Sequence, residues 1–87
     1  MRRRRYIPVA AKCEALKVYR MRRSGDSILG DPPLSPVDAI RSTEEFFSGH
    51  YTARMARGDV EDAARFLDGY RAAAYYVNRV HGARWSW

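Results

Sequence analysis

The sequence predicts an all-α protein: a small single-domain bundle of three main helices plus a short fourth, with a basic N-terminal arm. The chain of 87 residues is long enough for one domain with one modest core. Hydrophobic residues make up 46% of it and recur in places at three- and four-residue steps, which is typical of amphipathic helices. Turns rich in glycine and proline separate these stretches. We therefore expect a flexible basic arm over residues 1–7, a helical domain over 8–82 and a tryptophan-containing tail over 83–87.

The first helix is expected from Pro8 to Ser24. Proline suits the first turn because its missing N–H would be unpaired there in any case, and a glycine directly follows the serine. Leu16 and Tyr19 are expected to face the core. A loop over residues 25–35 follows, because turn-forming dipeptides occur there three times.

The second helix has a clear start. Ser35 is a good N-cap, Pro36 suits the first turn, and Asp38 stands where the acid of a capping box belongs. The helix is expected to run to just before Gly49, which ends or kinks it. Residues 50–57 then form the short fourth helix.

The third main helix, expected from Asp59 to His81, has the clearest pattern. Acidic side chains occupy its first turn, and Arg79 and His81 lie in its last turn, so both ends complement the helix dipole. Its inward stripe is expected to comprise Ala63, Phe66, Leu67, Tyr70, Ala74 and Val77.

Positive charge is concentrated at the start of the chain. Residues 1–23 contain nine basic side chains and one acidic side chain, a net charge of +8, whereas residues 24–49 carry −4 and residues 50–87 carry +2. All but two of the 16 cations are arginine. The planar guanidinium group suits phosphate, carboxylate and aromatic partners, so this bias favours a binding role. A GC-rich genome, which enriches arginine without any functional reason, is the alternative explanation.

The residue types needed for catalysis or metal binding are sparse. Two distant histidines and one cysteine offer no metal-ligand cluster. Glu44 and Glu45 are adjacent, so they point apart on a helix and cannot act as a facing acid–base pair. No glycine-rich phosphate loop occurs. The sequence therefore predicts a protein that is not an enzyme, with no catalytic residue, metal or cofactor.

The expected location is the cytoplasm. The single cysteine, Cys13, suits a reducing compartment and allows no internal disulfide. The apolar stretch after Arg5 is too short for the core of a secretory signal. No apolar run approaches the ~20 residues that span a bilayer, so no membrane partner is expected.

The leading functional hypothesis is binding of nucleic acid or a nucleoprotein complex through the arm and the first helix. Clustered cations neutralise several phosphates and give strongly salt-dependent binding, and Tyr6 and Tyr19 could add base stacking. The third helix is a poor recognition helix, since its first turn is acidic. A solvated tail with a charged helix face is the simpler alternative. The candidate nucleic-acid-binding residues are Arg2, Arg3, Arg4, Arg5, Lys12, Lys17, Arg20, Arg22 and Arg23.

A second hypothesis belongs to another class: a protein-binding inhibitor or adaptor. Its basis is one face of the third helix, expected to be exposed, where arginine and tyrosine surround a floor of small residues that includes Gly69. An ordinary solvated face is the alternative. Small size, compact helices and the lack of catalytic residues are typical of phage and mobile-element accessory proteins, for example an anti-CRISPR protein that blocks a host defence complex. The candidate protein-binding residues are Arg65, Ala72, Tyr75, Tyr76 and Arg79.

Overall fold

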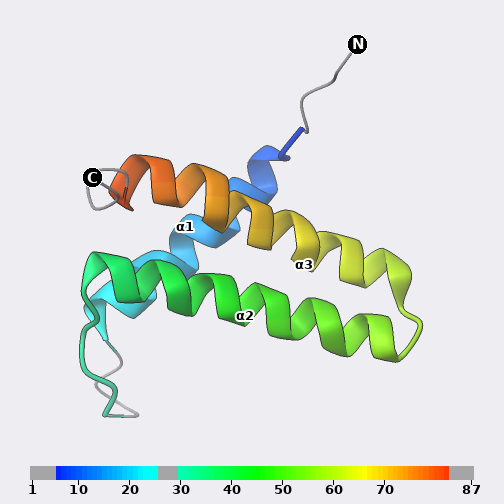
Figure 1. The fold of residues 1–87 in the computed structure, drawn as a ribbon, viewed down its shortest axis with the longest axis horizontal. Coiled ribbons are helices and arrows are strands. Elements are labelled where there is room, and N and C mark those ends of the chain that lie inside the picture. The colour runs from blue at the N-terminus through cyan, green and yellow to red at the C-terminus, as the bar shows by residue number, and fades with distance from the viewer. Residues whose placement is uncertain (1–5, 26–29, 83–87) are drawn as a thin grey trace.

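The computed structural model describes residues 6–25 and 30–82, and helices make up most of these two ranges (Figure 1). The all-α prediction is confirmed, since the described residues form no β-strand. Most of the expected arm (residues 1–7) and all of the expected tryptophan-containing tail (83–87) lie outside the described residues. The helices are α1 (Val9–Ser24), α2 (Pro36–Ala56) and α3 (Val60–Ala72), which continues as a π-helical segment, η1 (Ala73–Gly82).

The three helices enclose a core made largely of small side chains. In Figure 1, α2 and α3 run antiparallel to each other, and α1 crosses them obliquely on one side. Alanine projects only a methyl group from a helix, so helices that meet through alanines can lie close together. Phe47 is the largest fully buried side chain, and it fills the space between α2 and α3. The buried core cluster comprises Ala11, Ala15, Tyr19, Ala39, Ile40, Phe47, Ala72, Ala73 and Val77.

The second helix starts as the sequence predicts but does not stop at Gly49. The Oγ of Ser35 accepts a hydrogen bond from the backbone N–H of Asp38 at 3.2 Å, which confirms the predicted cap. The expected break is wrong, because α2 continues to Ala56 and includes residues 50–56 of the supposed fourth helix. A glycine inside a helix costs only about 1 kcal/mol relative to alanine, and contacts to α3 on both sides of it hold the helix together.

The buried stripe of the third helix agrees with the predicted one at Ala63 and Val77, which are both fully buried, but differs between them. Gly69 and Ala72 are buried, whereas Leu67 and Tyr70 are 37% and 36% exposed. The cause is the ring of Phe47, which lies so close to Gly69 that a Cβ atom at that position would overlap it. A large ring supplied by α2 therefore requires small residues on the facing side of α3. The expectation that Gly69 and Ala72 form an exposed floor is wrong for this reason.

The end of α1 is tied to the loop before α2. Tyr19 is buried, as predicted, and Leu34 packs partly buried against the core. The backbone N–H of Leu34 donates to the carbonyl of Arg22 at 3.1 Å, and Arg23 donates from its guanidinium group to the carbonyl of Leu34 at 2.9 Å. Gly25, with φ of 80°, makes this close approach possible, because a Cβ there would lie 2.8 Å from the carbonyl oxygen of Asp31.

Candidate nucleic-acid interface

The five cations predicted on the first helix are all on α1, but they do not form one basic face. Lys17 and Arg20 are exposed on its outer side. Arg22 is partly buried, with its guanidinium carbon 5.8 Å from the ring centroid of Phe46. Arg23 bonds to the loop and Lys12 points towards η1. The charge of α1 is therefore distributed over two separate surfaces.

None of these five cations forms an ion pair with a carboxylate of the described residues. The ion pairs in this part of the chain join Arg54 and Arg65 to Asp62, and Arg71 to Asp68. No described carboxylate therefore lies within ion-pairing distance of the cations on α1. The four arginines Arg2–Arg5 lie outside the described residues.

The first of the two surfaces is a hollow between the end of α1 and the loop before α2. Lys17, Arg20 and Arg22 line it, together with Asp31 and Ser42. The Nε atom of Arg22 is buried there and has no hydrogen-bond partner. The hollow brings three of the predicted cations together, but its described lining residues include a carboxylate and no aromatic ring.

The second surface is a groove of about 860 Å³ between the start of α1 and the later turns of the third helix. In Figure 1 the first turn of α1 lies next to α3, which places residues far apart in the sequence side by side. No acidic side chain lines this groove within the described ranges. We call it the tyrosine groove, and its lining residues are Tyr6, Ile7, Lys12, Arg71, Tyr75, Tyr76 and Arg79.

Two contacts fix the walls of the tyrosine groove. Arg71 donates one hydrogen bond to the backbone carbonyl of Tyr6 at 3.4 Å and another to the carboxylate of Asp68 at 3.1 Å. The Nζ atom of Lys12 lies 5.4 Å from the ring centroid of Tyr76, a cation–π geometry. Since Asp68 neutralises Arg71 from outside the groove, Lys12 and Arg79 supply its uncompensated positive charge.

The structure divides the residues predicted to bind a protein. Tyr75, Tyr76 and Arg79 come together in the tyrosine groove. Ala72 is 0% exposed and cannot contact a partner, which corrects that prediction. Arg65 is exposed but lines a different hollow, beside Lys17.

Sequence reasoning missed Arg71 and Ile7 as neighbours of this groove. Arg71 was hidden because its relation to Tyr6 spans 65 positions along the chain, and no local spacing reveals such a contact. The available signal was the combination of arginines and adjacent tyrosines near the end of the third helix with a tyrosine before the first. The sequence alone did not show that these two segments meet.

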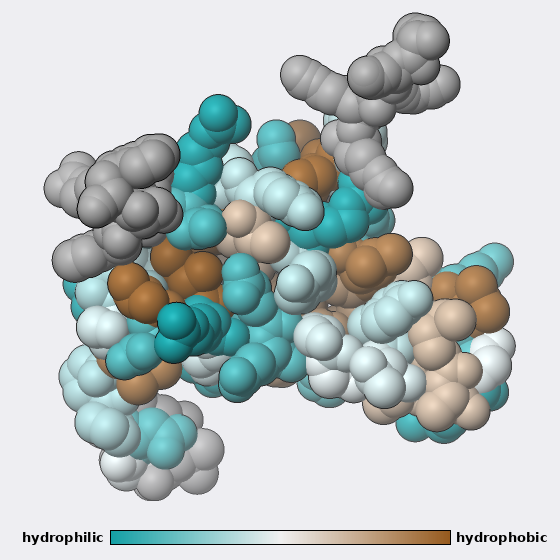
Figure 2. Space-filling view, viewed as in Figure 1, coloured by the Kyte–Doolittle hydropathy of each residue, from teal (hydrophilic) through white to brown (hydrophobic). Residues whose placement is uncertain are grey.

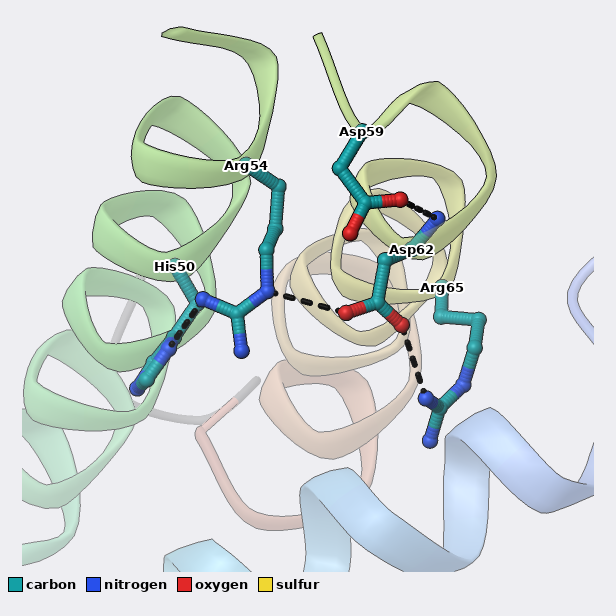
Figure 3. Close-up of polar contacts among 5 residues, drawn as sticks. All are labelled: His50, Arg54, Asp59, Asp62 and Arg65. Carbon is teal, nitrogen blue, oxygen red and sulfur yellow. Dashed lines mark hydrogen bonds and ion pairs between the residues drawn. The ribbon is translucent and has the colours of Figure 1, made fainter. Parts of the chain in front are cut away.

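The α2–α3 tip contains a second cluster of charged residues, which form hydrogen bonds with one another (Figure 3). Asp62 accepts hydrogen bonds from Arg54 at 2.9 Å and from Arg65 at 3.1 Å, and its own N–H donates to Asp59 at 3.4 Å. A further guanidinium nitrogen of Arg54 lies 3.5 Å from Nδ1 of His50. We call these five residues the tip cluster.

The tip cluster stabilises the helix pair. The hydrogen bond from Arg54, supported by that from Arg65, lowers the pKa of Asp62, so the acid stays ionised between its two arginines. The ring of Phe66 from α3 stacks on His50 at 4.9 Å, and the guanidinium carbon of Arg54 lies 4.8 Å from the same ring. Arg54 and the contact between His50 and Phe66 thus join α2 to α3, and Arg54 has a structural role.

No other chemistry is assembled in the part of the chain that the structure describes. It contains no group of three or more histidine, cysteine, aspartate or glutamate side chains placed to hold a metal ion. His81 stacks on Tyr19 with ring centroids 4.6 Å apart. Among the described helices, none combines the length and the apolar character that crossing a membrane requires.

Comparison of the chain with protein-family models, with curated proteins and with solved structures returns no match.

Proposed function

We propose that this chain is a small non-enzymatic binding protein that engages nucleic acid, or a nucleoprotein complex, through its basic N-terminal arm and α1. The observation that supports the proposal is the absence of any ion pair between the five cations of α1 and a described carboxylate. Together with Arg2–Arg5, these cations give residues 1–23 a net charge of +8. We place this role in the cytoplasm, where the lone Cys13 would remain reduced.

A concentrated positive surface binds a polyanion because each neutralised phosphate releases condensed counterions. The logarithm of the binding constant then falls linearly with the logarithm of the salt concentration, by about 0.9 per phosphate contacted on duplex DNA and about 0.7 on single strands. The counterions come from the nucleic acid, so the salt slope reports how many phosphates the cations of the protein contact.

The test is a fluorescence-anisotropy titration of a labelled oligonucleotide between about 50 and about 200 mM salt. The variant Lys17→Ala/Arg20→Ala should reduce the slope by about 1 to 2, and alanine at all of Arg2–Arg5 by about 3 to 4. The matched control is Arg41→Ala/Arg57→Ala, which removes the same charge from exposed positions of α2 and its C-cap. Absence of binding at low salt, or equal losses in the control, would contradict the proposal.

The second candidate, a protein-binding inhibitor or adaptor such as an anti-CRISPR protein, is favoured by one observation. Tyr75 is 66% exposed beside Arg79, and tyrosine and arginine are the residue types enriched at interface hot spots. A purified partner whose binding survives nuclease treatment and moderate salt, and is lost with Tyr75→Ala, would support this function. A partner that dissociates on nuclease treatment would support the first.

A further inference from the structure

We infer that the tyrosine groove is a binding site for single-stranded nucleic acid, in which bases stack on Tyr75 and Tyr6 while Lys12 and Arg79 hold the phosphates. This inference rests on the proposed function and makes it more specific. It moves the centre of binding from the outer side of α1 to the junction of α1 with η1.

The aromatic rings of the groove are available to a ligand. Tyr6 is 76% exposed and Tyr75 is 66% exposed, which is a large fraction for aromatic side chains on adjoining segments. Stacking on such rings tolerates any sequence because every base has a π-face. Tyr76 differs, since Lys12 already lies over its ring. The groove thus offers two open rings and one ring that positions a cation.

The cations of the groove are placed for a backbone that follows the rings. Arg79 is exposed and forms no ion pair with a described residue, and no carboxylate lies among the lining residues. Arg71 is mostly buried and donates hydrogen bonds to Asp68 and to the carbonyl of Tyr6. Arg71 is therefore a positioning residue, which holds the segment before α1 against α3 and so keeps the groove formed.

The combination of rings and cations favours single strands over duplex. Bases in a duplex are stacked on one another, so their faces are not available to tyrosine. A duplex would use the cations alone, and these are too few in the groove for tight binding by phosphate contacts only. Ile7 is the one aliphatic side chain among the described lining residues and it packs against the core, so a partner in the groove would contact mainly tyrosine rings and cations.

Two other surfaces fit a nucleic acid less well. In the hollow with Lys17, Arg20 and Arg22, the described lining residues include the carboxylate of Asp31 and no ring, so they offer phosphate contacts only. On the face shown in Figure 2, several brown areas are separated by hydrophilic residues. Isolated apolar residues of this kind are normal on a protein surface.

The experiment compares single-stranded and duplex DNA of the same length, about 12 nucleotides, in the anisotropy titration. Tyr75→Ala should weaken binding of the single strand at least about fivefold, and Tyr75→Phe should preserve it, because stacking needs the ring and not the hydroxyl. Duplex binding should stay within about twofold of wild type in both variants. Arg79→Ala should weaken single-strand binding and lower its salt slope by about 0.7.

The matched controls are Tyr70→Ala and Arg57→Ala. Tyr70 is a partly exposed tyrosine of α3, and Arg57 is an exposed arginine at the end of α2; neither lines the groove. Both should bind single strands as wild type does. Circular dichroism and thermal unfolding confirm that each variant folds, and Tyr6→Ala gives an independent probe outside the helices.

The outcomes separate this inference from the function on which it rests. If Tyr75→Ala and Tyr6→Ala bind single strands as wild type while Lys17→Ala/Arg20→Ala weakens binding, the groove inference is wrong and the proposed function stands. If wild type binds neither single-stranded nor duplex DNA at low salt, both the groove inference and the proposed function are wrong. If Tyr75→Ala abolishes binding of a nuclease-resistant protein partner without affecting oligonucleotides, the groove is a protein-docking site and the inference is overturned.

Discussion

The tip cluster and the tyrosine groove use the same residue types in opposite ways. At the tip, Arg54 and Arg65 both bind Asp62; the pair with Arg54 joins α2 to α3, and the pair with Arg65 lies within α3. In the groove, Arg79 and Lys12 have tyrosine rings for neighbours and no ion pair with a described carboxylate. The cations that lie beside a carboxylate therefore have a structural role, whereas those that lie away from carboxylates are available to a ligand.

This difference shows why net charge alone is a poor guide to a binding surface. The first turn of α3 is rich in acidic side chains, which neutralise the arginines that reach it, whereas η1 contains no acidic side chain. Aromatic rings also have different roles in the two regions. Phe66 is packed against His50 and Arg54 at the tip, while Tyr75 is largely exposed in the groove.

The largest expected effect of a single substitution on stability lies in the α2–α3 contact. Gly69→Ala places a methyl group against the buried ring of Phe47 and should lower the free energy of unfolding by about 1 to 3 kcal/mol. Gly49→Ala is the matched control, because a Cβ at that position meets nothing within 4 Å, and it should raise stability by up to about 1 kcal/mol. Urea denaturation followed by far-UV circular dichroism measures both. Equal effects of the two variants would contradict the packing described.

The next largest effect on stability distinguishes the structural arginine Arg54 from the available arginine Arg79. Arg54→Ala removes the hydrogen bond to Asp62 and the contact with Phe66, so it should lower the midpoint of thermal unfolding. Arg79→Ala removes an equal charge from an exposed position and should change the free energy of unfolding by less than about 0.5 kcal/mol. If Arg79→Ala destabilises the protein as much as Arg54→Ala does, the distinction between structural and available cations fails.

The smallest effect concerns acid pH. The folded-state pKa of Asp62 lies below its ordinary value of 3.8, because Arg54 and Arg65 hydrogen-bond the ionised form. Its contribution to stability is therefore complete above that ordinary value and is lost as the pH falls through the lower folded value. Urea denaturation at a series of pH values below about 5 should show this loss in wild type, and Asp62→Asn should lack it.

Glu44 provides a control of opposite sign for the pH series. Burial raises its pKa above 4.5, more than Arg41 lowers it, so the ionised form is disfavoured in the folded state. The ionised Glu44 side chain therefore lowers stability at pH values above its raised folded-state pKa, and this unfavourable contribution disappears as the pH falls towards 4.5. Glu44→Gln should remove this gain in stability on acidification and leave the loss of stability due to Asp62 unchanged. A loss below pH 4 that persists in Asp62→Asn would place the acid sensitivity elsewhere.

The sequence predicted the helices better than their faces. The cap at Ser35 and the start of α3 at Asp59 follow from local hydrogen bonding, which nearby residues determine. Gly49 was misread as a break because propensity rules weigh a residue without its tertiary contacts. Gly69 and Ala72 were misread as an exposed floor because only the position of Phe47, on another helix, shows that small residues must face inward there.

The candidate site was predictable in its parts but not in its assembly. Lys12, Tyr75, Tyr76 and Arg79 were all identified from residue type and charge. They were assigned to two different functions, since the sequence placed Lys12 on one helix and the tyrosines on another. The contact between Arg71 and Tyr6, which brings those segments together, depends on how three helices pack.

The most direct test of the contrast between the two regions is backbone-amide chemical-shift mapping by NMR during addition of a single-stranded oligonucleotide. We predict that the amide signals of Lys12, Tyr75, Tyr76 and Arg79 shift with the added oligonucleotide, while those of His50, Arg54 and Asp62 remain in place. Shifts concentrated at the tip cluster, with the groove signals unchanged, would contradict the account, as would a spectrum in which no signal moves.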